Sequence, residues 1–163
     1  MDEITYEQLL SKTIQLKVRD IYKTKNIDGI IEHKLKKSEG TCNKYGYIIN
    51  IQVVERSIGK VYSIDRESLI EYKINYKIKS ILPKLDEEYD CIIGSITKMG
   101  IICYIQMEDK EIDITNSPLQ IIIPKELCEI DKYKEGMKIK IIAVDFRIKF
   151  GATQIQVIGK IDD

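Results

Sequence analysis

Two periodicities of apolar and polar positions divide the first half of the chain into strands and one helix. Residues 13–19 alternate apolar and polar side chains, which predicts a strand with one buried face. Asn26 stands before apolar residues at helical spacing, and that pattern finishes with lysines followed by Gly40. This arrangement predicts a helix that begins after Asn26 and ends before Gly40.

Two longer apolar-rich runs follow at residues 47–54 and 69–81, with a turn expected around Gly59. In the second run, tyrosine and isoleucine at every other position alternate with lysine or asparagine. Such alternation predicts a sheet with one buried face and one basic outer face. The order strand, helix, strand, strand predicts an α+β N-terminal domain over residues 1–82, an antiparallel sheet with one helix, that ends at Pro83.

The second half of the chain has the pattern of short strands separated by turns. Lys98-Met99-Gly100 is a tight hairpin turn with a glycine that permits positive φ. A looser segment that contains Pro118 and Pro124 crosses over between the third and the fourth strand. The expected strands are residues 89–97, 100–106, 110–115, 137–145 and 153–160. This order predicts an all-β, partly open OB-fold barrel over residues 83–163.

Composition and charge exclude several classes of protein. The chain has 163 residues, of which 44% are apolar, enough to fill the cores of small domains. It carries 26 basic and 26 acidic residues, so no overall field attracts it to nucleic acid or to a membrane. The charge is uneven, with 15 basic and 11 acidic residues in positions 1–82 and 11 and 15 in positions 83–163. Any contact with nucleic acid must therefore come from a local patch.

The sequence shows neither a secretory leader pattern nor an apolar run of the roughly 18 residues that a membrane span needs. We therefore expect a soluble intracellular protein with no membrane partner. The cysteines Cys42, Cys91, Cys103 and Cys128 are far apart in sequence and are expected to stay reduced. Since there is no C-x-x-C pair and His33 is the single histidine, no zinc site is expected.

An enzymatic function has little support in the sequence. It contains no G-x-x-x-x-G-K-[ST] loop, no G-x-G-x-x-G motif and no G-x-S-x-G motif. Two acidic runs, residues 86–90 and 108–113, could in principle hold Mg²⁺, but such runs are usually solvated turns. We expect no metal, no cofactor and no catalytic residue. A nuclease that uses these carboxylates is the remaining enzymatic alternative.

Cationic and aromatic residues in the second half form a candidate surface for RNA. Residues 138–150 carry a local net charge of +3 in a half of the chain that is otherwise acidic. OB-type barrels bind single strands through cationic side chains beside an aromatic stacking surface. The candidate RNA-binding residues are Lys98, Tyr104, Lys110, Arg147, Lys149 and Phe150. Binding is expected to be weak, salt-dependent and of little sequence preference. The alternative is a solvated loop with Phe150 packed in the core.

Residues 39–49, EGTCNKYGYII, form a glycine-punctuated loop between the predicted helix and the next strand. Gly40 and Gly46 would serve as helix cap and turn in any protein. The segment also resembles the helix-to-strand junction of the larger stalk subunit of archaeal, eukaryotic and viral multisubunit RNA polymerases. Residues 93–105 look like the first hairpin of that family's OB-type domain, and residues 159–163 resemble its C-terminal pattern.

The resemblance implies a noncatalytic subunit of a DNA-directed RNA polymerase that supports transcription initiation. Its N-terminal domain would dock on the core subunits, its C-terminal domain would contact nascent single-stranded RNA weakly, and a smaller stalk subunit would be a further partner. The docking residues implied are Glu39, Gly40, Cys42, Tyr45, Gly46 and Gly59. Such a protein would act in the nucleus or cytoplasm, or in a viral factory or virion if it is viral. The alternative is a free-standing OB-fold protein that binds single-stranded nucleic acid.

Overall fold

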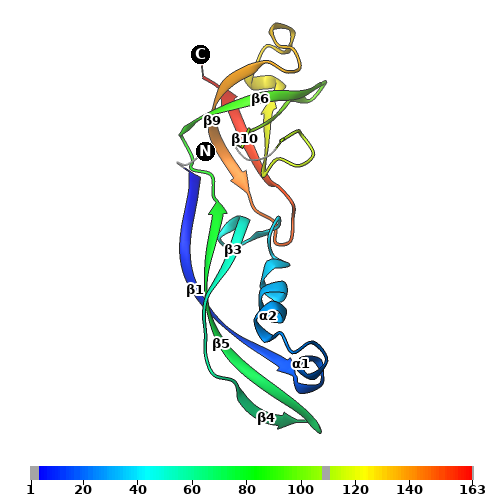
Figure 1. The fold of residues 1–163 in the computed structure, drawn as a ribbon. Coiled ribbons are helices and arrows are strands. Elements are labelled where there is room, and N and C mark those ends of the chain that lie inside the picture. The colour runs from blue at the N-terminus through cyan, green and yellow to red at the C-terminus, as the bar shows by residue number, and fades with distance from the viewer. Residues whose placement is uncertain (1–3, 108–110, 163) are drawn as a thin grey trace. The chain divides into compact units, whose positions relative to one another are not determined.

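The computed structural model describes residues 4–107 and 111–162 (Figure 1). The chain forms two compact units. One, the barrel unit, consists of Met1–Thr5, Gly40–Ile48 and Ile81–Asp163. The other, the sheet unit, consists of Tyr6–Glu39 and Ile49–Ser80. The segment Gly40–Ile48 therefore belongs with the barrel, although it lies far from the barrel strands in sequence.

The first half of the chain forms a five-stranded sheet and two helices. The strands are β1 (Thr5–Lys17), β2 (Cys42–Asn43), β3 (Gly46–Arg56), β4 (Lys60–Ile64) and β5 (Glu67–Ile81). The helices are α1 (Val18–Thr24) and α2 (Ile27–Lys36). The sheet has the order β1-β5-β3-β2, and β4 pairs with β5 as an antiparallel hairpin. The sequence predicts neither β4 nor α1.

The alternation along the second apolar run is present in β5. Tyr72, Ile74 and Ile78 are buried, whereas Lys73 and Lys77 are exposed. The core of the sheet unit also contains, from the other elements, Ile14, Leu16, Ile31, Leu35 and Ile51. Because only one face of β5 is buried, the other face can carry lysine side chains without the free-energy cost of burying a charge.

The helix α2 begins where the sequence predicts it. The side-chain Oδ1 of Asn26 accepts a hydrogen bond from the N–H of Gly29 at 3.0 Å and caps the helix. The prediction of a strand through residue 19 is wrong at its end, because β1 stops at Lys17 and α1 follows. This helix has only 7 residues and leaves Tyr22 exposed, so it is too short for a sustained apolar repeat to reveal it in the sequence.

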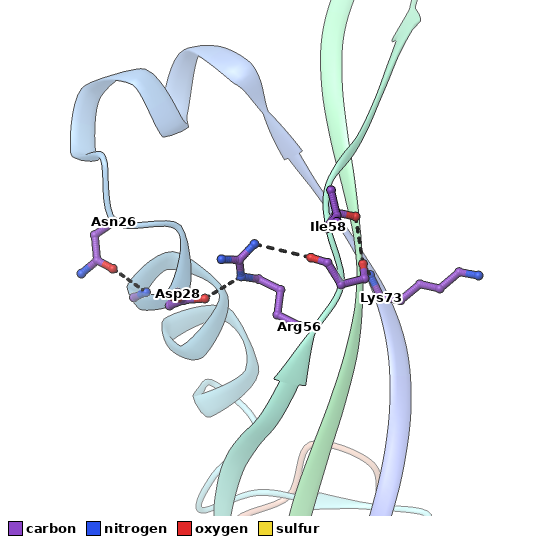
Figure 2. A network of polar contacts seen from close by, with 7 residues as sticks. Asn26, Asp28, Arg56, Ile58 and Lys73 are labelled. Atoms are coloured by element: carbon purple, nitrogen blue, oxygen red, sulfur yellow. Dashed lines mark hydrogen bonds and ion pairs between the residues drawn. The ribbon is translucent and has the colours of Figure 1, made fainter.

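A polar network joins the end of β3 to α2 and to β5 (Figure 2). Arg56 donates from Nε to Asp28 Oδ1 at 2.6 Å, and its guanidinium lies 5.2 Å from the centre of the Tyr72 ring. The N–H of Ser57 donates to the carbonyl oxygen of Lys73, and Ser57 Oγ accepts from the N–H of Lys73, both at 2.9 Å. These bonds hold the predicted turn between β3 and β4 against β5.

The second half of the chain forms a closed five-stranded barrel. Its strands are β6 (Glu88–Thr97), β7 (Gly100–Tyr104), β8 (Leu119–Pro124), β9 (Lys138–Arg147) and β10 (Ile155–Ile161). The order around the barrel is β6-β7-β8-β10-β9, and β9 pairs back to β6. Only β8 and β10 run parallel among these pairs. The predicted barrel is confirmed, but it is closed rather than partly open.

The interior of the barrel is filled mainly by isoleucine. Fully or almost fully buried residues are Ile93, Ile101, Cys103, Leu119, Ile121, Ile123, Ile141, Ala143, Ile155 and Val157. They stand at alternate positions along their strands, as expected for a small barrel whose interior is a packed core. Such a core fixes which residues point outward, and those residues form the candidate site.

The third barrel strand is not where the sequence predicts it. The prediction of a strand at residues 110–115 is wrong for the part that the structure describes, and β8, at Leu119–Pro124, takes that place. Asp113 Oδ1 accepts hydrogen bonds from the N–H and the hydroxyl of Thr115 at 2.8 and 2.5 Å. In this turn the side chain of Asp113 accepts hydrogen bonds from backbone N–H groups that would pair with a neighbouring strand if the segment were part of a sheet. Pro118 stands just before β8, where a missing N–H is tolerated.

Candidate nucleic-acid interface and docking hairpin

Strand register places a row of polar residues on the outer surface of the barrel. Gln156 in β10 lies opposite Arg147 in β9 and opposite Gln120 in β8. The residues directly before and after both glutamines are buried, so the glutamine side chains point outward. Tyr104, at the end of β7, extends the row, because the antiparallel register of β7 and β8 brings it beside Gln120.

This row borders a surface depression of about 320 Å³. Its lining includes Gln120, Arg147, Lys149, Thr153, Gln154 and Gln156. Among the described residues, the lining holds two cations and no carboxylate. The volume is at the lower end of the range for small-molecule sites, which suits one nucleotide-sized group. A cationic, amide-lined depression of this kind favours an anionic, hydrogen-bonding ligand.

Phe150 lies in the connection between β9 and β10, next to Lys149 in the chain. Its side chain is 86% exposed, so the alternative that Phe150 packs in the core is wrong. An exposed phenylalanine beside two cations offers a stacking surface for a base. The nearest acid along β9 is Asp145, whose Oδ1 accepts a hydrogen bond from the N–H of Phe146 at 2.8 Å.

Gln154 is held in one orientation at the edge of the depression. Its Nε2 donates to the carbonyl oxygens of Ile114 and Ser117, both at 3.0 Å. Two carbonyl oxygens require a donor, so the amide nitrogen must face them. These bonds also connect the β9–β10 connection to the segment that precedes β8.

The structure separates the predicted RNA-binding residues into two places. At one end of the barrel strands lie Tyr104, Arg147, Lys149 and Phe150. Lys98 lies at the other end, in the turn before Gly100, which pairs with the last residue of β8. Lys110 lies outside the described residues. Lys98 therefore does not share a site with the depression.

Sequence reasoning missed the three glutamines Gln120, Gln154 and Gln156. They carry no charge and belong to no motif, and their neighbourhood depends on the position of β8, which the sequence misplaced. The one signal available was the alternation of Leu119, Ile121 and Ile123, which predicts an outward Gln120 once the segment is taken as a strand.

Residues 40–48 form a small hairpin, which we call the docking hairpin because it carries most of the predicted docking residues. Cys42 and Asn43 pair with the start of β3. The Oδ1 of Asn43 accepts a hydrogen bond from the N–H of Tyr45 at 2.8 Å. At its turn Lys44 is exposed and Tyr45 is half-buried, with Lys44 Nζ 5.0 Å from the centre of the Tyr45 ring. Both side chains are accessible to a partner at this turn.

The two glycines of the docking hairpin shape its backbone. Gly46 has a φ of +102°, and a Cβ at this position would lie 2.1 Å from the carbonyl oxygen of Ile81. Only glycine fits such a conformation at such an approach. Gly40 has a φ of +77°, and its N–H donates to the carbonyl oxygen of Ile48 at 2.8 Å.

The backbone of Cys42 attaches the docking hairpin to the β9–β10 connection. Its N–H donates to the carbonyl oxygen of Ala152 at 2.8 Å, and its own carbonyl oxygen accepts from the N–H of Gly151 at 2.9 Å. The Cys42 side chain is buried, and this burial raises the pKa of its thiol above the ordinary value. The docking hairpin and the connection that carries Lys149 are thus joined within one unit.

The other two predicted docking residues belong to the sheet unit. Glu39 Oε1 accepts a hydrogen bond from the N–H of Ile51 at 2.8 Å and lies 3.9 Å from Lys36 Nζ. Gly59 packs so closely that a Cβ there would lie 2.5 Å from Cγ2 of Ile70. In the structure, both residues have contacts that stabilise the sheet unit. Their role in docking stays a prediction.

Neither a protein-family model nor a curated protein matches this sequence. Within residues 4–107 and 111–162, no helix is long and apolar enough to cross a membrane. The same part of the chain contains no group of three or more His, Cys, Asp or Glu side chains that could hold a metal ion. The four cysteines are free.

Proposed function

We propose that this protein is a noncatalytic stalk subunit of a multisubunit DNA-directed RNA polymerase. The docking hairpin and the sheet unit attach it to the core subunits, and the barrel contacts nascent single-stranded RNA during initiation. The observation that carries the proposal is that the docking hairpin and the connection bordering the cationic depression are joined by the backbone hydrogen bonds of Cys42. A single compact unit would then carry both the contact with the enzyme and the contact with RNA.

In this proposal the barrel is an OB-fold. Its strand order, with the third and fifth strands parallel, supports that assignment. OB-folds bind oligonucleotides on the face of their second and third strands and through two loops, one between the first and second strands and one between the fourth and fifth. Here the corresponding places hold Tyr104 and Gln120 on β7 and β8, Lys98 in the β6–β7 turn, and Lys149 and Phe150 in the β9–β10 connection.

RNA contact follows from the chemistry of the depression. Arg147 and Lys149 line the depression and supply charge for phosphate groups. Phe150, which follows Lys149 in the chain and does not line the depression, is exposed and supplies a face for stacking. The half of the chain that forms the barrel carries 11 basic and 15 acidic residues, which opposes a polyanion. Binding is accordingly weak and falls with salt, as suits a strand that must slide past the protein.

The sheet unit is the proposed α+β docking domain. Its antiparallel strands and the helices α1 and α2 leave apolar side chains in solvent around the β3–β4 connection: Val54, Ile58 and Val61 are 57%, 94% and 65% exposed. Such residues gain free energy when a partner covers them. On the docking hairpin, Tyr45 is the proposed aromatic anchor for the core subunits. A smaller stalk subunit is a further proposed partner.

The proposal is tested by purifying the tagged full chain from its native source and identifying the chains that accompany it. RNA polymerase core subunits are expected with the wild type. Tyr45→Ala is expected to reduce their recovery, because losing an aromatic anchor costs about 2 kcal/mol, roughly thirtyfold in affinity. Tyr22→Ala, at an exposed tyrosine of α1, is the matched control. Recovery of the wild type without any polymerase subunit would remove the stalk assignment.

A free-standing OB-fold protein that binds single-stranded nucleic acid is the second candidate. It is favoured by one observation: the cationic depression is lined by residues of this chain alone, so RNA could bind there without a partner chain. Full RNA binding by the isolated protein, together with no polymerase subunit in the purification, would select this candidate. Metal-dependent cleavage of RNA or DNA by the purified chain would instead revive the nuclease alternative, which neither proposal accommodates.

A further inference from the structure

A second depression, of about 480 Å³, lies where β6 pairs with the start of β9. Its lining includes Ile92 of β6, which points outward because both of its neighbours in the strand are buried, and the exposed Lys138 and Lys140 of β9. The rest of the described lining is Asp90, Cys91, Gln106 and Ile139. An apolar side chain beside ammonium groups offers a surface for a base and charge for its phosphates.

The two lysines of this second depression differ in their partners. Lys140 Nζ lies 3.6 Å from Glu88 Oε1, and Lys140 stands opposite Asp90 in the ladder of β6 and β9. Lys138 stands opposite Ile92 and has no ion pair among the described residues. Lys138 is therefore the cation that can take a phosphate group. Because the second depression also holds a carboxylate, it attracts a phosphate less strongly than the cationic depression, whose described lining holds none.

Strand register connects the two depressions. The row of outward residues that begins at Arg147 reaches Tyr104 at the end of β7. Tyr104 lies opposite Ile92 in β6, and Ile92 lies opposite Lys138. The row thus returns to β9, at the end of that strand opposite to Arg147. Because the strands of a barrel are staggered, one row perpendicular to them can meet the same strand twice.

The row has a defined minimum length. It takes five steps between neighbouring strands, from β9 across β10, β8, β7 and β6 and back to β9. Neighbouring strands are about 4.8 Å apart, so the row is at least about 24 Å long. A single strand with stacked bases advances about 3.4 Å per nucleotide, so about seven nucleotides are needed to span it. This number is within the range of site sizes that OB-folds show.

Tyr104 stands between the two depressions and packs against the backbone of β6. A Cβ added to Gly94 would lie 3.1 Å from Cδ1 of Tyr104 and 3.0 Å from Cδ1 of Ile114, so the missing side chain makes room for both. Tyr104 is half-buried, and the part of its ring that stays in solvent is a stacking surface for a base midway along the row.

We propose that one single strand of RNA occupies both depressions, passes Tyr104 between them and gains a second phosphate contact at Lys138. This inference rests on the RNA contact of the proposed function and adds a subsite and a minimum strand length. A strand too short for the row binds at the cationic depression alone, since that lining has two cations and no carboxylate among the described residues. A longer strand reaches Lys138 without a second loss of translational entropy.

The test is fluorescence anisotropy of the full chain with a labelled uridine trinucleotide and a labelled uridine decanucleotide. The trinucleotide is shorter than the row, whereas the decanucleotide exceeds it even with stacked bases, at about 34 Å. A salt concentration of about 0.1 M keeps the Debye length near 10 Å, so a charge change in one depression has little effect at the other. The longer strand also gains affinity from its several registers on one depression, so variants decide the question.

Lys138→Glu should weaken binding of the decanucleotide about threefold to tenfold and make its salt slope shallower by about 0.7, because one phosphate contact is lost. Its affinity for the trinucleotide should stay that of the wild type. The double variant Arg147→Glu, Lys149→Glu should weaken binding of both strands. Lys23→Glu, which changes the net charge equally but lies in the sheet unit, is the matched control and should leave both affinities unchanged.

An NMR titration of the wild type gives a second measurement that needs no variant. The trinucleotide should shift the backbone amide signals around Arg147, and the decanucleotide should also shift those of Ile92 and Lys138. Binding of the decanucleotide without shifts at Ile92 and Lys138, or with unchanged affinity in a folded Lys138→Glu, would overturn the second subsite and leave the RNA contact in place. No binding of either strand would remove the RNA contact of the proposed function and this inference with it.

Discussion

Cys42 donates its backbone N–H to the carbonyl oxygen of Ala152 at 2.8 Å, which joins the docking hairpin to the β9–β10 connection. The sequence-based boundary at residue 82 assigns these two segments to different domains, whereas both belong to the barrel unit. Side-chain changes at Arg147 or Lys149 should leave this backbone contact intact. A change that unfolds the β9–β10 connection should also disturb the docking hairpin.

The cationic depression is expected to bind RNA through Arg147 and Lys149. The double variant Arg147→Glu, Lys149→Glu should bind single-stranded RNA more weakly. The slope of its logarithmic affinity against logarithmic salt concentration should be shallower by about 1.4, because about two phosphate contacts disappear. Fluorescence anisotropy across a salt series measures both effects.

Lys23→Glu is the control for that double variant, because Lys23 is an exposed cation of α1 and belongs to the sheet unit. Its affinity and salt slope should stay close to those of the wild type. Equal RNA affinity of wild type and the double variant at low salt would show that the depression is not the RNA face.

Gly46 should be irreplaceable for stability. Gly46→Ala places a Cβ 2.1 Å from the carbonyl oxygen of Ile81 at a φ of +102°, so the free energy of unfolding should fall by about 3 kcal/mol or more. Gly136→Ala is the control, since Gly136 has a φ of +86° and nothing within 4 Å of the added Cβ. Its free energy of unfolding should fall by only about 1–2 kcal/mol, because the alanine backbone is strained at this positive φ. Urea denaturation distinguishes them, and similar losses would contradict the close approach to Ile81.

Loss of the hydroxyl group should have different effects on the free energy of unfolding at two buried serines, Ser80 and Ser117. Within the described residues, Ser80 Oγ is a buried side-chain oxygen with no hydrogen-bond partner. Ser80→Ala should therefore be neutral or stabilise by up to about 1 kcal/mol, since no desolvated hydroxyl remains. Ser117→Ala should destabilise by about 1–2 kcal/mol, because Ser117 Oγ donates to Leu119. A clear destabilisation by Ser80→Ala in thermal or urea unfolding would mean that its hydroxyl has a partner.

Asp113 should make folding stability depend on acid pH. The hydroxyl of Thr115, followed by the N–H groups of Thr115 and Asn116, lowers the pKa of Asp113 below its ordinary 3.8. Because the folded-state pKa is the lower one, the contribution is full above 3.8 and is lost as pH falls through the folded-state value. Asp113→Asn should therefore flatten the decline of melting temperature in this acid range. Asp131→Asn is the control, and its melting temperature should decline as in the wild type. If the melting temperature of Asp113→Asn also declines as in the wild type, the hydrogen bonds of Asp113 do not contribute to stability as predicted.

Sequence pattern determined the elements that carry a long, regular periodicity. The Asn26 cap and the helical spacing after it predict α2, and the alternation through Tyr72, Ile74 and Ile78 predicts β5. Both follow from burial of one face, which leaves a direct trace in the order of side chains. The short helix α1 and β4 leave no such trace, because few of their side chains are buried.

Residue type determined only part of the candidate site. Arg147, Lys149 and Phe150 could be recognised from charge and aromaticity within one short segment. Gln154 could not, since its importance comes from hydrogen bonds to Ile114 and from the position of β8. Neutral amides acquire a defined direction only when their surroundings hold them, and those surroundings come from distant parts of the chain.

The sequence by itself determined which short segments bury apolar side chains and, through them, that the second half of the chain is a barrel. Only the tertiary structure decided that β8 pairs in parallel with β10 and that Cys42 binds Ala152. These contacts join segments far apart in sequence, and their free energy is gained only when the barrel closes and excludes water. No local periodicity records such a pairing, so it could not be predicted from the order of residues.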